Sequence, residues 1–250
     1  MELRKVRPQW PAPEWVEALC TVRTGGFSRA PYDSFNLGTH VGDRPEHVAL
    51  NRERLREELG AAGGVLYLNQ IHGTAVVEAR SSMTGLPPVD ADAAVTRERN
   101  LAVAVMTADC LPVLFFNERE PVVAAAHAGW RGLCSGVLEN TVNAMKADPR
   151  YTSAYLGPCI GPSAFEIGPE VREAFIERDP DCRCCFAALP SGKYLADLPA
   201  LARRRLTSSG IPADRIYGGD YCTYTRTDLF YSYRREHVTG RMASVIMIRS

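Results

Sequence analysis

The amino-acid sequence predicts an α+β fold, or a layered sandwich, rather than a regular alternation of strands and helices. Short apolar runs bounded by turn residues crowd into residues 65–126, whereas segments with helical periodicity lie irregularly around them. Hydrophobic residues make up 46% of the chain and charged residues 23%, which is typical of a globular protein with a substantial core. The length of 250 residues allows one large domain or two small ones.

The first third of the chain predicts a strand and then a helix. Residues 18–23 form an apolar run that ends at a glycine turn. Asp43, with Glu46 three residues later, resembles a helix start in which Asp43 is the cap. We expect that helix to run to about Leu59 and to end at Gly60.

The middle of the chain is rich in expected strands, and the clearest helices follow it. The expected strands cover residues 65–68, 75–78, 91–96, 101–106, 112–116 and 122–126. Apolar residues recur at helical spacing over residues 131–147, which predicts one helix there. The remaining expected elements are helices over residues 169–178 and 198–208, and strands over residues 229–233 and 243–248.

The charge balance argues against nucleic-acid and anionic-membrane partners. Lysine plus arginine equals aspartate plus glutamate, 29 each, so no strong field favours either partner. The N-terminus has no apolar signal region, and no stretch approaches the length of a membrane span. Eight cysteines are too sparse for a disulfide scaffold, so most should be free thiols in a reducing compartment. We therefore expect a cytoplasmic protein with no nucleic acid and no membrane partner.

Three residues of the kinds that bind metal ions stand at the ends of strand-like runs. His72, Cys110 and His127 each lie where the chain leaves the core and can present a side chain to a site. Two imidazoles and a thiolate that converge from separate strand ends are what a catalytic zinc with an open coordination position requires. We predict that these three residues bind zinc, with copper as the alternative metal.

Neighbouring residues favour the metal interpretation, although each residue taken singly is more often a packed or hydrogen-bonded structural residue. Asp109 and Gln70 lie beside two of the three and could orient them. Gly129 follows His127 closely and lets the backbone approach a bound group. The cysteine spacing does not fit a zinc finger, so a structural zinc is the weaker form of the hypothesis.

Other reactive or charged residues have two interpretations each. Arg131, at an expected helix start, is unfavourable for the helix dipole and indicates a bound anion, unless it is simply solvated. Arg235 belongs, with Arg234 and Arg241, to a basic cluster that is either a solvated face or a place where one arginine reaches a phosphate. Cys182, Cys184 and Cys185 are too close together for a closed tetrahedral metal site, and their role stays unassigned.

Several long motifs in a fixed order resemble those of one bacterial family. They are Arg-Thr-Gly-Gly-Phe-Ser at residues 23–28, Asn-Leu-Gly-Thr-His-Val-Gly-Asp at 36–43, Asn-Arg at 51–52, Gln-Ile-His-Gly at 70–73, Thr-Ala-Asp-Cys-Leu-Pro-Val at 107–113, His-Ala-Gly-Trp-Arg-Gly at 127–132, Gly-Pro at 157–158, and Ser-Tyr-Arg-Arg at 232–235 leading to Thr-Gly-Arg-Met at 239–242. The chain closely resembles the bacterial laccase-domain proteins, variously called multicopper polyphenol oxidoreductases, peptidoglycan editing factors and purine nucleoside phosphorylases. The resemblance is nearly end to end, except at the cysteine-rich segment 182–185.

The resemblance implies a single domain over residues 1–250, folded as an α/β/β/α-type layered sandwich related to the catalytic domain of cytotoxic necrotizing factors. It also implies zinc at the residues matching His72, Cys110 and His127, the same three selected above. The implied activity is zinc-dependent purine nucleoside phosphorylase, which cleaves adenosine, inosine and S-methyl-5′-thioadenosine with inorganic phosphate, together with adenosine deaminase activity. The expected assembly is a monomer or a small homo-oligomer.

Further residues receive expected roles in that activity. Zinc deaminases use a glutamate for proton transfer, and since none lies in these motifs, Asp109 is the substitute candidate. Arginines could hold the phosphate and stabilise charge. The expected catalytic residues are therefore Asp109 and Arg235, and the expected substrate-binding residues are Arg23, Asn36, Gln70 and Arg131.

Three other functions stay open at this stage. A metal-free cysteine hydrolase or amidase that edits peptidoglycan precursors would use Cys110 as nucleophile and His127 as base. A copper polyphenol oxidase needs many histidines for its several coppers, and the chain has five. A non-catalytic partner-binding protein would explain neither the histidines nor the glycines beside them.

Overall fold

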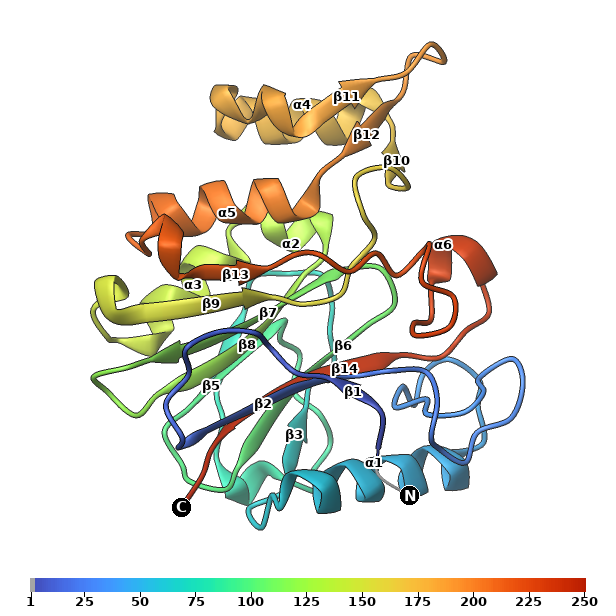
Figure 1. Cartoon of the computed structure of the whole chain (residues 1–250), viewed down its shortest axis with the longest axis vertical. Helices are drawn as coiled ribbons and strands as arrows, with labels where there is room; N and C mark the ends of the chain where they lie inside the picture. Colours follow the sequence, from blue (N-terminus) through green and yellow to red (C-terminus); the bar gives the residue numbers. More distant parts are fainter. Residues whose placement is uncertain (1–2) are drawn as a thin grey trace.

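Two β-sheets that lie face to face form the centre of the molecule. The computed structural model describes residues 3–250. The first sheet has the strand order β1-β2-β14-β6-β3 and the second has the order β13-β9-β7-β8-β5-β4 (Figure 1). The strands of the first sheet are β1 (Lys5–Val6), β2 (Val16–Thr21), β14 (Met242–Ile248), β6 (Ala102–Thr107) and β3 (Val65–Tyr67). Those of the second sheet are β13 (Ile216–Gly218), β9 (Thr152–Leu156), β7 (Leu111–Asn117), β8 (Val123–Ala128), β5 (Ala93–Thr96) and β4 (Val76–Glu78).

Both sheets mix parallel and antiparallel pairs. β14 pairs antiparallel with β2 and β6, and β3 adds to β6 in parallel. In the second sheet β7 and β8 form an antiparallel hairpin, and β13 and β4 join the two edges in parallel. The strands expected between residues 65 and 126 are confirmed to within about two residues at each end.

Side-chain alternation along the central strands produces the layers. In β6, Ala102, Ala104 and Met106 pack with helix α1 (Pro45–Leu59), whereas Val103 and Val105 pack with the second sheet. In β7 alternate side chains face the first sheet and a group of helices. That group comprises α2 (Trp130–Ser135), α3 (Val137–Met145) and α5 (Leu198–Ser208). The helix–sheet–sheet–helix order agrees with the layered α+β fold that the sequence predicts (Figure 1).

Helix α1 begins differently from the expectation. Pro45 occupies its first turn, and Arg44, whose side chain makes no capping bond, is the N-cap. Asp43 lies one residue earlier and accepts hydrogen bonds from Ser28 and Asn36, so it fastens a loop instead of capping the helix. The C-terminal prediction is confirmed, because Gly60 adopts φ 63° there.

Two expected elements are wrong. The single helix over residues 131–147 is two helices, because Gly136 adopts φ 105° between α2 and α3. The expected strand over residues 229–233 pairs with no other strand. Its first backbone N–H groups bond the carbonyl of Arg226 instead, and Tyr233 already starts the short helix α6 (Tyr233–Glu236). The apolar run over residues 229–232 is therefore buried in turns and irregular structure instead of in a strand, and Tyr231 is fully buried.

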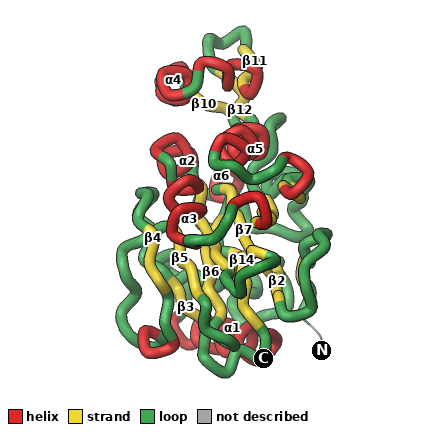
Figure 2. The backbone as a smooth tube through the Cα atoms, turned by 90° about the vertical axis from the view of Figure 1, so that its left-hand side faces the viewer, coloured by secondary structure: helices red, strands yellow, loops and turns green. Residues whose placement is uncertain are grey.

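A small subdomain-like lobe projects from the helical face. It contains helix α4 (Pro169–Arg178) and a three-stranded sheet of β10 (Glu166–Ile167), β12 (Tyr194–Ala196) and β11 (Phe186–Ala188) (Figures 1 and 2). Cys182 and Cys185 are buried in its apolar contacts and Cys184 is exposed, all as free thiols. Within residues 3–250 no helix has both the length and the apolar character needed to cross a bilayer.

Candidate metal centre

His72, Cys110 and His127 lie together, as their strand-end positions predict. His72 follows β3, Cys110 immediately precedes β7, and His127 lies near the end of β8, paired across the hairpin with Pro112. The possible ligand atoms of the three side chains all lie within 4.8 Å of one another. Nε2 of His72 is 3.9 Å from the Cys110 sulfur, and the two imidazole rings are 4.8 Å apart. His127 is buried, Cys110 is half-buried and His72 is exposed, so the cluster opens on one side.

One carboxylate, that of Asp92, fixes two of the three residues. Its Oδ1 accepts a hydrogen bond from Nδ1 of His127 at 2.8 Å, which leaves Nε2 of that ring as the atom available to a metal ion. The same carboxylate accepts hydrogen bonds from the backbone N–H groups of Ile71, His72 and Gly73 at 3.2, 3.0 and 2.6 Å. His72 adopts φ 60°, a conformation that these bonds hold. Burial would raise the pKa of Asp92, but the bonds from His127 and Gly73 lower it.

Cys110 and His127 shift each other's pKa in opposite directions. Burial alone would raise the pKa of the Cys110 thiol, but the charge and hydrogen bonds of His127 and His72 outweigh burial and lower it to about 6. Burial would lower the pKa of His127, but Cys110 and Asp92 raise it to about 9. The protein therefore favours a thiolate at neutral pH, which is the form of cysteine that binds metal ions.

The backbone around the cluster is shaped to bring the side chains close. A Cβ added to Gly129 would lie 3.0 Å from Cδ2 of His72 and 3.1 Å from Sγ of Cys110, so only glycine leaves this space clear. Asp109 adopts φ 99° and turns the chain just before Cys110. Its two oxygens accept hydrogen bonds from the Thr223 hydroxyl at 2.6 Å and the Arg234 N–H at 2.7 Å. A thiolate and two imidazoles held in this way fit a transition-metal ion such as zinc, with one position left open.

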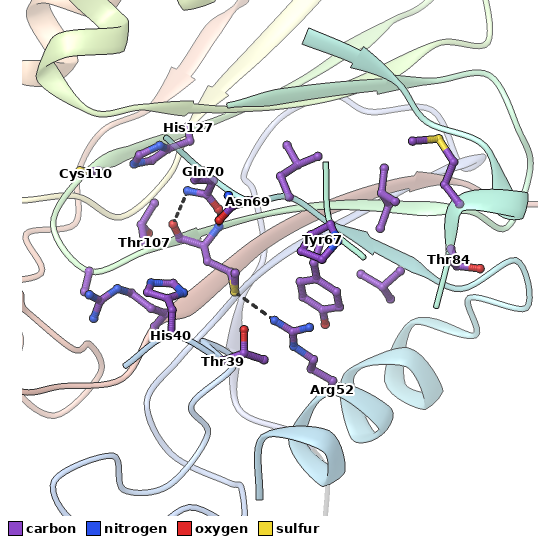
Figure 3. Close-up of a pocket in the computed structure, with 18 of the residues that line it drawn as sticks. Thr39, His40, Arg52, Tyr67, Asn69, Gln70, Thr84, Thr107, Cys110 and His127 are labelled. Atoms are coloured by element: carbon purple, nitrogen blue, oxygen red, sulfur yellow. Dashed lines mark hydrogen bonds between the residues drawn. The ribbon is translucent and has the colours of Figure 1, made fainter. Parts of the chain in front are cut away.

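The cluster opens onto a cavity of about 870 Å³. Figure 3 shows His127 and Cys110 on one side of it and Arg52 with Tyr67 on the other. Its chemically distinctive lining residues are His40, Arg52, Tyr67, Asn69, Gln70, His72, Thr107, Cys110, His127, Tyr233 and Arg241. No aspartate or glutamate lines it among the residues that the structure describes. Apolar side chains of β3 and of the loop over residues 83–88 complete the wall.

The other residues that the sequence selected lie in different places. Gln70 lines the cavity, and both atoms of its amide bond the backbone of Met106, at 2.7 and 2.8 Å (Figure 3). Asn36 is fully buried and bonds Gly38 and the backbone N–H of Arg241, so it shapes a loop beside the cavity. Neither Asn36 nor Asp109 belongs to the cavity lining.

The three arginines predicted to bind or act on substrate also lie outside the lining. Arg23 and Arg235 both bond the carboxylate of Glu236, at 2.8 and 3.1 Å. Arg131 is exposed at the start of α2, and its guanidinium stacks 4.3 Å from the ring centroid of Trp130. None of the three therefore faces the metal-binding cluster directly.

Sequence reasoning missed Asp92 altogether and gave no site role to His40 or Arg52, whereas Arg241 was named only as a member of the basic cluster near the C-terminus. His40 stands inside the motif at residues 36–43, so the motif itself was a usable signal. Asp92 carries a weaker one, an acidic residue at the start of an otherwise apolar strand. Arg52 stands in the short motif Asn-Arg at residues 51–52, but its role was not predicted, because only the folded chain places its helix beside β3.

The layered α+β fold and the cavity-facing cluster of two histidines and a cysteine place this chain among proteins whose side chains could hold a metal ion. The chain matches the family of multi-copper polyphenol oxidoreductase laccases over residues 17–249. It belongs to that family.

Named relatives and solved structures cover almost the whole chain. Purine nucleoside phosphorylase YfiH of Escherichia coli (strain K12) is 50% identical over 243 residues, which are 96% of this chain and 97% of the relative. A purine nucleoside phosphorylase of Haemophilus influenzae is 46% identical over 246 residues, 98% of this chain and 99% of the relative. The crystal structure of Neisseria meningitidis protein NMB0706 matches with a TM-score of 0.93 at 50% identity, covering 98% of this chain and 99% of that one. YlmD from Geobacillus stearothermophilus matches with a TM-score of 0.92 at 30% identity, covering 99% and 98%.

Proposed function

We propose that this chain is a zinc-dependent purine nucleoside phosphorylase that cleaves adenosine, inosine and S-methyl-5′-thioadenosine, and that it also deaminates adenosine. One observation carries the proposal: the cluster of His72, Cys110 and His127 opens onto a cavity of about 870 Å³ in a chain whose relatives are named purine nucleoside phosphorylases. Small-molecule sites have cavities of this size. Residues 1–250 would act as one domain, as a monomer or a small homo-oligomer.

The proposed zinc would be held by His72, Cys110 and His127. When bound, it would supply a Lewis-acidic centre that polarises an oxygen atom of the reactants. The chain prepares that position in three ways. Asp92 holds His127 in the tautomer that presents Nε2, His127 favours the thiolate of Cys110, and Gly129 leaves room for the group.

Phosphorolysis forms a bond from a phosphate oxygen to C1′ of the ribose as the bond from C1′ to the purine nitrogen breaks. The base leaves with the electron pair and takes up a proton. A protein accelerates such a reaction by holding both reactants in contact and by keeping out water, which would otherwise hydrolyse the nucleoside. Val65 and Tyr67 line the cavity and are only partly buried, so they offer an apolar surface to the purine. Asp109 would contribute through the turn that it fixes before Cys110, and Arg235 through the Thr223 and Phe230 carbonyls that it bonds.

The test is a nucleoside assay on metal-loaded protein with and without inorganic phosphate. We expect phosphate-dependent release of adenine from adenosine and of hypoxanthine from inosine, and some conversion of adenosine to inosine. His72→Ala and Cys110→Ala should abolish base release together with metal binding, as measured by elemental analysis. Cys184→Ser is the matched control, since Cys184 is an exposed thiol outside the cavity, and it should behave as wild type. If loaded wild-type protein leaves all three nucleosides intact, the proposal is wrong.

A second candidate function is favoured by one specific arrangement, the chain of contacts from Asp92 through His127 to Cys110. The same three residues could serve a cysteine hydrolase or amidase that acts on peptidoglycan precursors, with Cys110 as nucleophile and His127 as base. That activity would survive chelators and be lost on thiol alkylation. The zinc phosphorylase would be lost under both treatments and recover from chelation when zinc is added back.

A copper phenol oxidase has less support in the structure. Only His40, His72 and His127 of the five histidines lie at the cavity. A site with several coppers needs more imidazoles than these. Copper-dependent oxygen uptake on a phenol, absent from the zinc-loaded protein, would favour this function over phosphorolysis.

A further inference from the structure

Two arginines line the cavity with part of their hydrogen-bonding capacity unused. Arg52, on α1, donates Nε–H to the carbonyl of Leu37 at 3.0 Å and contacts a methionine sulfur at 3.7 Å, a weak acceptor. Arg241 donates one Nη–H to the carbonyl of Thr239 at 3.0 Å and to the following carbonyl at 3.1 Å. Their remaining N–H groups have no acceptor in the described part of the chain, residues 3–250. Both guanidinium groups are therefore able to receive a ligand from the cavity.

Neither guanidinium forms a close ion pair with a carboxylate of the described residues, although Cys110 and Asp109 interact electrostatically with Arg241. Among the described residues no carboxylate oxygen lies within 4.0 Å of Arg52 or Arg241, and none lines the cavity. Burial lowers the pKa of each arginine, which reflects the cost of keeping a charge there. His40 interacts electrostatically with both, so the three basic groups lie near one another. Unpaired charge in a partly dry cavity is unfavourable unless a ligand of opposite charge occupies it.

The two arginines are nevertheless held in fixed positions. The Arg52 guanidinium lies 3.9 Å from the ring centroid of Tyr67 (Figure 3). Leu37 links the pair, because its carbonyl accepts from Arg52 and its N–H donates to the carbonyl of Arg241 at 3.1 Å. A Cβ on Gly38 would lie 2.8 Å from Cγ of Arg241, so that glycine lets the arginine side chain pass over the loop. Side chains fixed before binding lose little entropy when a ligand arrives.

We propose that Arg52 and Arg241, with His40 at the rim, bind a phosphate-type oxyanion in the cavity beside the metal-binding cluster. Guanidinium groups suit this ligand, because their planar forks match the oxygens of phosphate. The proposal rests on the proposed phosphorylase where it names inorganic phosphate, the co-substrate, as the ligand. The phosphate group of a nucleoside monophosphate offers the same chemistry. Arg241 also interacts electrostatically with Cys110, which places the anion site next to the cluster.

The arginines that the sequence suggested for phosphate differ from this pair in one respect. Arg23 and Arg235 share the carboxylate of Glu236 and lie outside the lining, so each already has an ion-pair partner within the protein. A phosphate bound to them would have to displace that carboxylate. Among the described residues no carboxylate is bonded to Arg52 or Arg241, and this distinguishes them as the anion site.

The experiment compares Arg52→Gln and Arg241→Gln with wild type on zinc-loaded protein. The matched control is Arg56→Gln, one helical turn further along α1, where the arginine is exposed and pairs only with Glu53. In the kinetic arm, phosphate is varied at saturating adenosine. We expect the KM for phosphate to rise roughly 10- to 100-fold in both cavity variants, as for loss of a charge-assisted hydrogen bond. The KM for adenosine and the metal content should stay near wild-type values, and the control should match wild type throughout.

A binding arm uses no turnover. The melting temperature is measured with inorganic phosphate, or with adenosine 5′-monophosphate, against chloride at equal ionic strength. We expect at least one of the two to stabilise wild type and Arg56→Gln but neither cavity variant, and the stronger stabiliser identifies the source of the phosphate group. Arg52→Lys serves if Arg52→Gln fails to fold, since it keeps the charge, loses the planar fork and should bind phosphate more weakly.

The outcomes separate this inference from the proposed function. Phosphate-dependent cleavage by wild type with an unchanged KM for phosphate in both variants would overturn the arginine site and leave the phosphorylase standing. If no nucleoside is cleaved but phosphate stabilises wild type and not the variants, the anion site stands without the phosphorylase. If neither phosphate compound stabilises wild type, and the kinetic arm shows no change, the inference is wrong.

Discussion

Two acidic residues, Asp92 and Glu236, organise neighbouring parts of this molecule in different ways. Asp92 is fully buried and bonds the ring of His127 and the backbone of His72, so its charge supports side chains that face the cavity. Glu236, with a side chain 24% exposed, bonds the guanidinium groups of Arg23 and Arg235. One carboxylate therefore orients side chains toward a site, and the other holds two guanidinium groups in ion pairs away from the cavity.

The comparison teaches that the partner of a charged residue decides what it can do. Arg235 stands in a long sequence motif, yet its guanidinium is occupied by Glu236 and by the carbonyls of Thr223, Tyr224 and Phe230. Arg52 stands in a motif of only two residues, Asn-Arg at 51–52, yet it faces a cavity that no carboxylate of the described residues lines. Position in a motif does not reveal which charges the fold has already paired.

Of the variants that test this comparison, the replacement of Asp92 should have the largest effect, which is a loss of zinc affinity. In Asp92→Asn the charge that holds the Nδ1–H form of His127 is lost, and the ring proposed to bind the metal is no longer fixed. We expect the affinity for zinc to fall about 10- to 100-fold, as for other residues that orient a metal ligand. Competition with a chromophoric chelator measures this, and Glu236→Gln is the control, with wild-type zinc affinity. Equal affinities in all three proteins would show that Asp92 does not support a metal centre.

Gly129→Ala should have a smaller effect, and only on the metal-binding cluster that Asp92 supports. The added methyl group would lie 3.0 Å from Cδ2 of His72 and 3.1 Å from Sγ of Cys110, so both side chains must move by a few tenths of an ångström. We expect zinc affinity to fall severalfold, with a modest loss of thermal stability in the metal-free protein. Gly85→Ala, in open space on the loop at the cavity rim, is the steric control for stability, although its φ of 80° adds backbone strain. A loss of zinc affinity in the control alone would contradict the packing explanation.

The part of the site that could be predicted from sequence is the part defined by strand ends. Short apolar runs locate where the chain leaves the core, and His72, Cys110 and His127 stand at three such points. The layers followed from the same runs, since alternate residues of a buried strand must cover two faces. The three residues that could hold a metal ion were therefore identifiable from local pattern alone, before the fold was known.

The remainder depends on contacts between distant segments. Asp92 reaches His127 because β5 pairs with β8 in a register that aligns Ala93 with Ala126, and no local pattern gives that register. Arg52 meets Tyr67 and Leu37 only when α1 packs against the first sheet. The broken helix was missed for a simpler reason, because a glycine inside an apolar helical pattern does not by itself show that it adopts a positive φ.

The smallest effect is expected at Glu236, on folding stability. Glu236→Gln removes the charge that pairs with Arg23 and Arg235 and keeps the shape of the side chain. We expect the free energy of unfolding at pH 7 to fall by on the order of 1–2 kcal/mol, because the group is partly exposed and only partly screened by water. Urea denaturation of metal-loaded proteins measures the difference.

The pH dependence of that difference tests its cause. Burial would raise the pKa of Glu236, but the bonds from Thr239, Arg23 and Arg235 lower it below the ordinary value of 4.5. A carboxyl group with a lowered pKa in the folded state contributes its full stability above the unfolded pKa, and that stability is lost as the pH falls through the folded pKa. Wild type should therefore exceed Glu236→Gln in stability at pH 6–7, and the two should converge as the pH falls below 4.5. A difference that persists unchanged in acid would mean that shape or packing at Glu236, and not its charge, holds the two arginines.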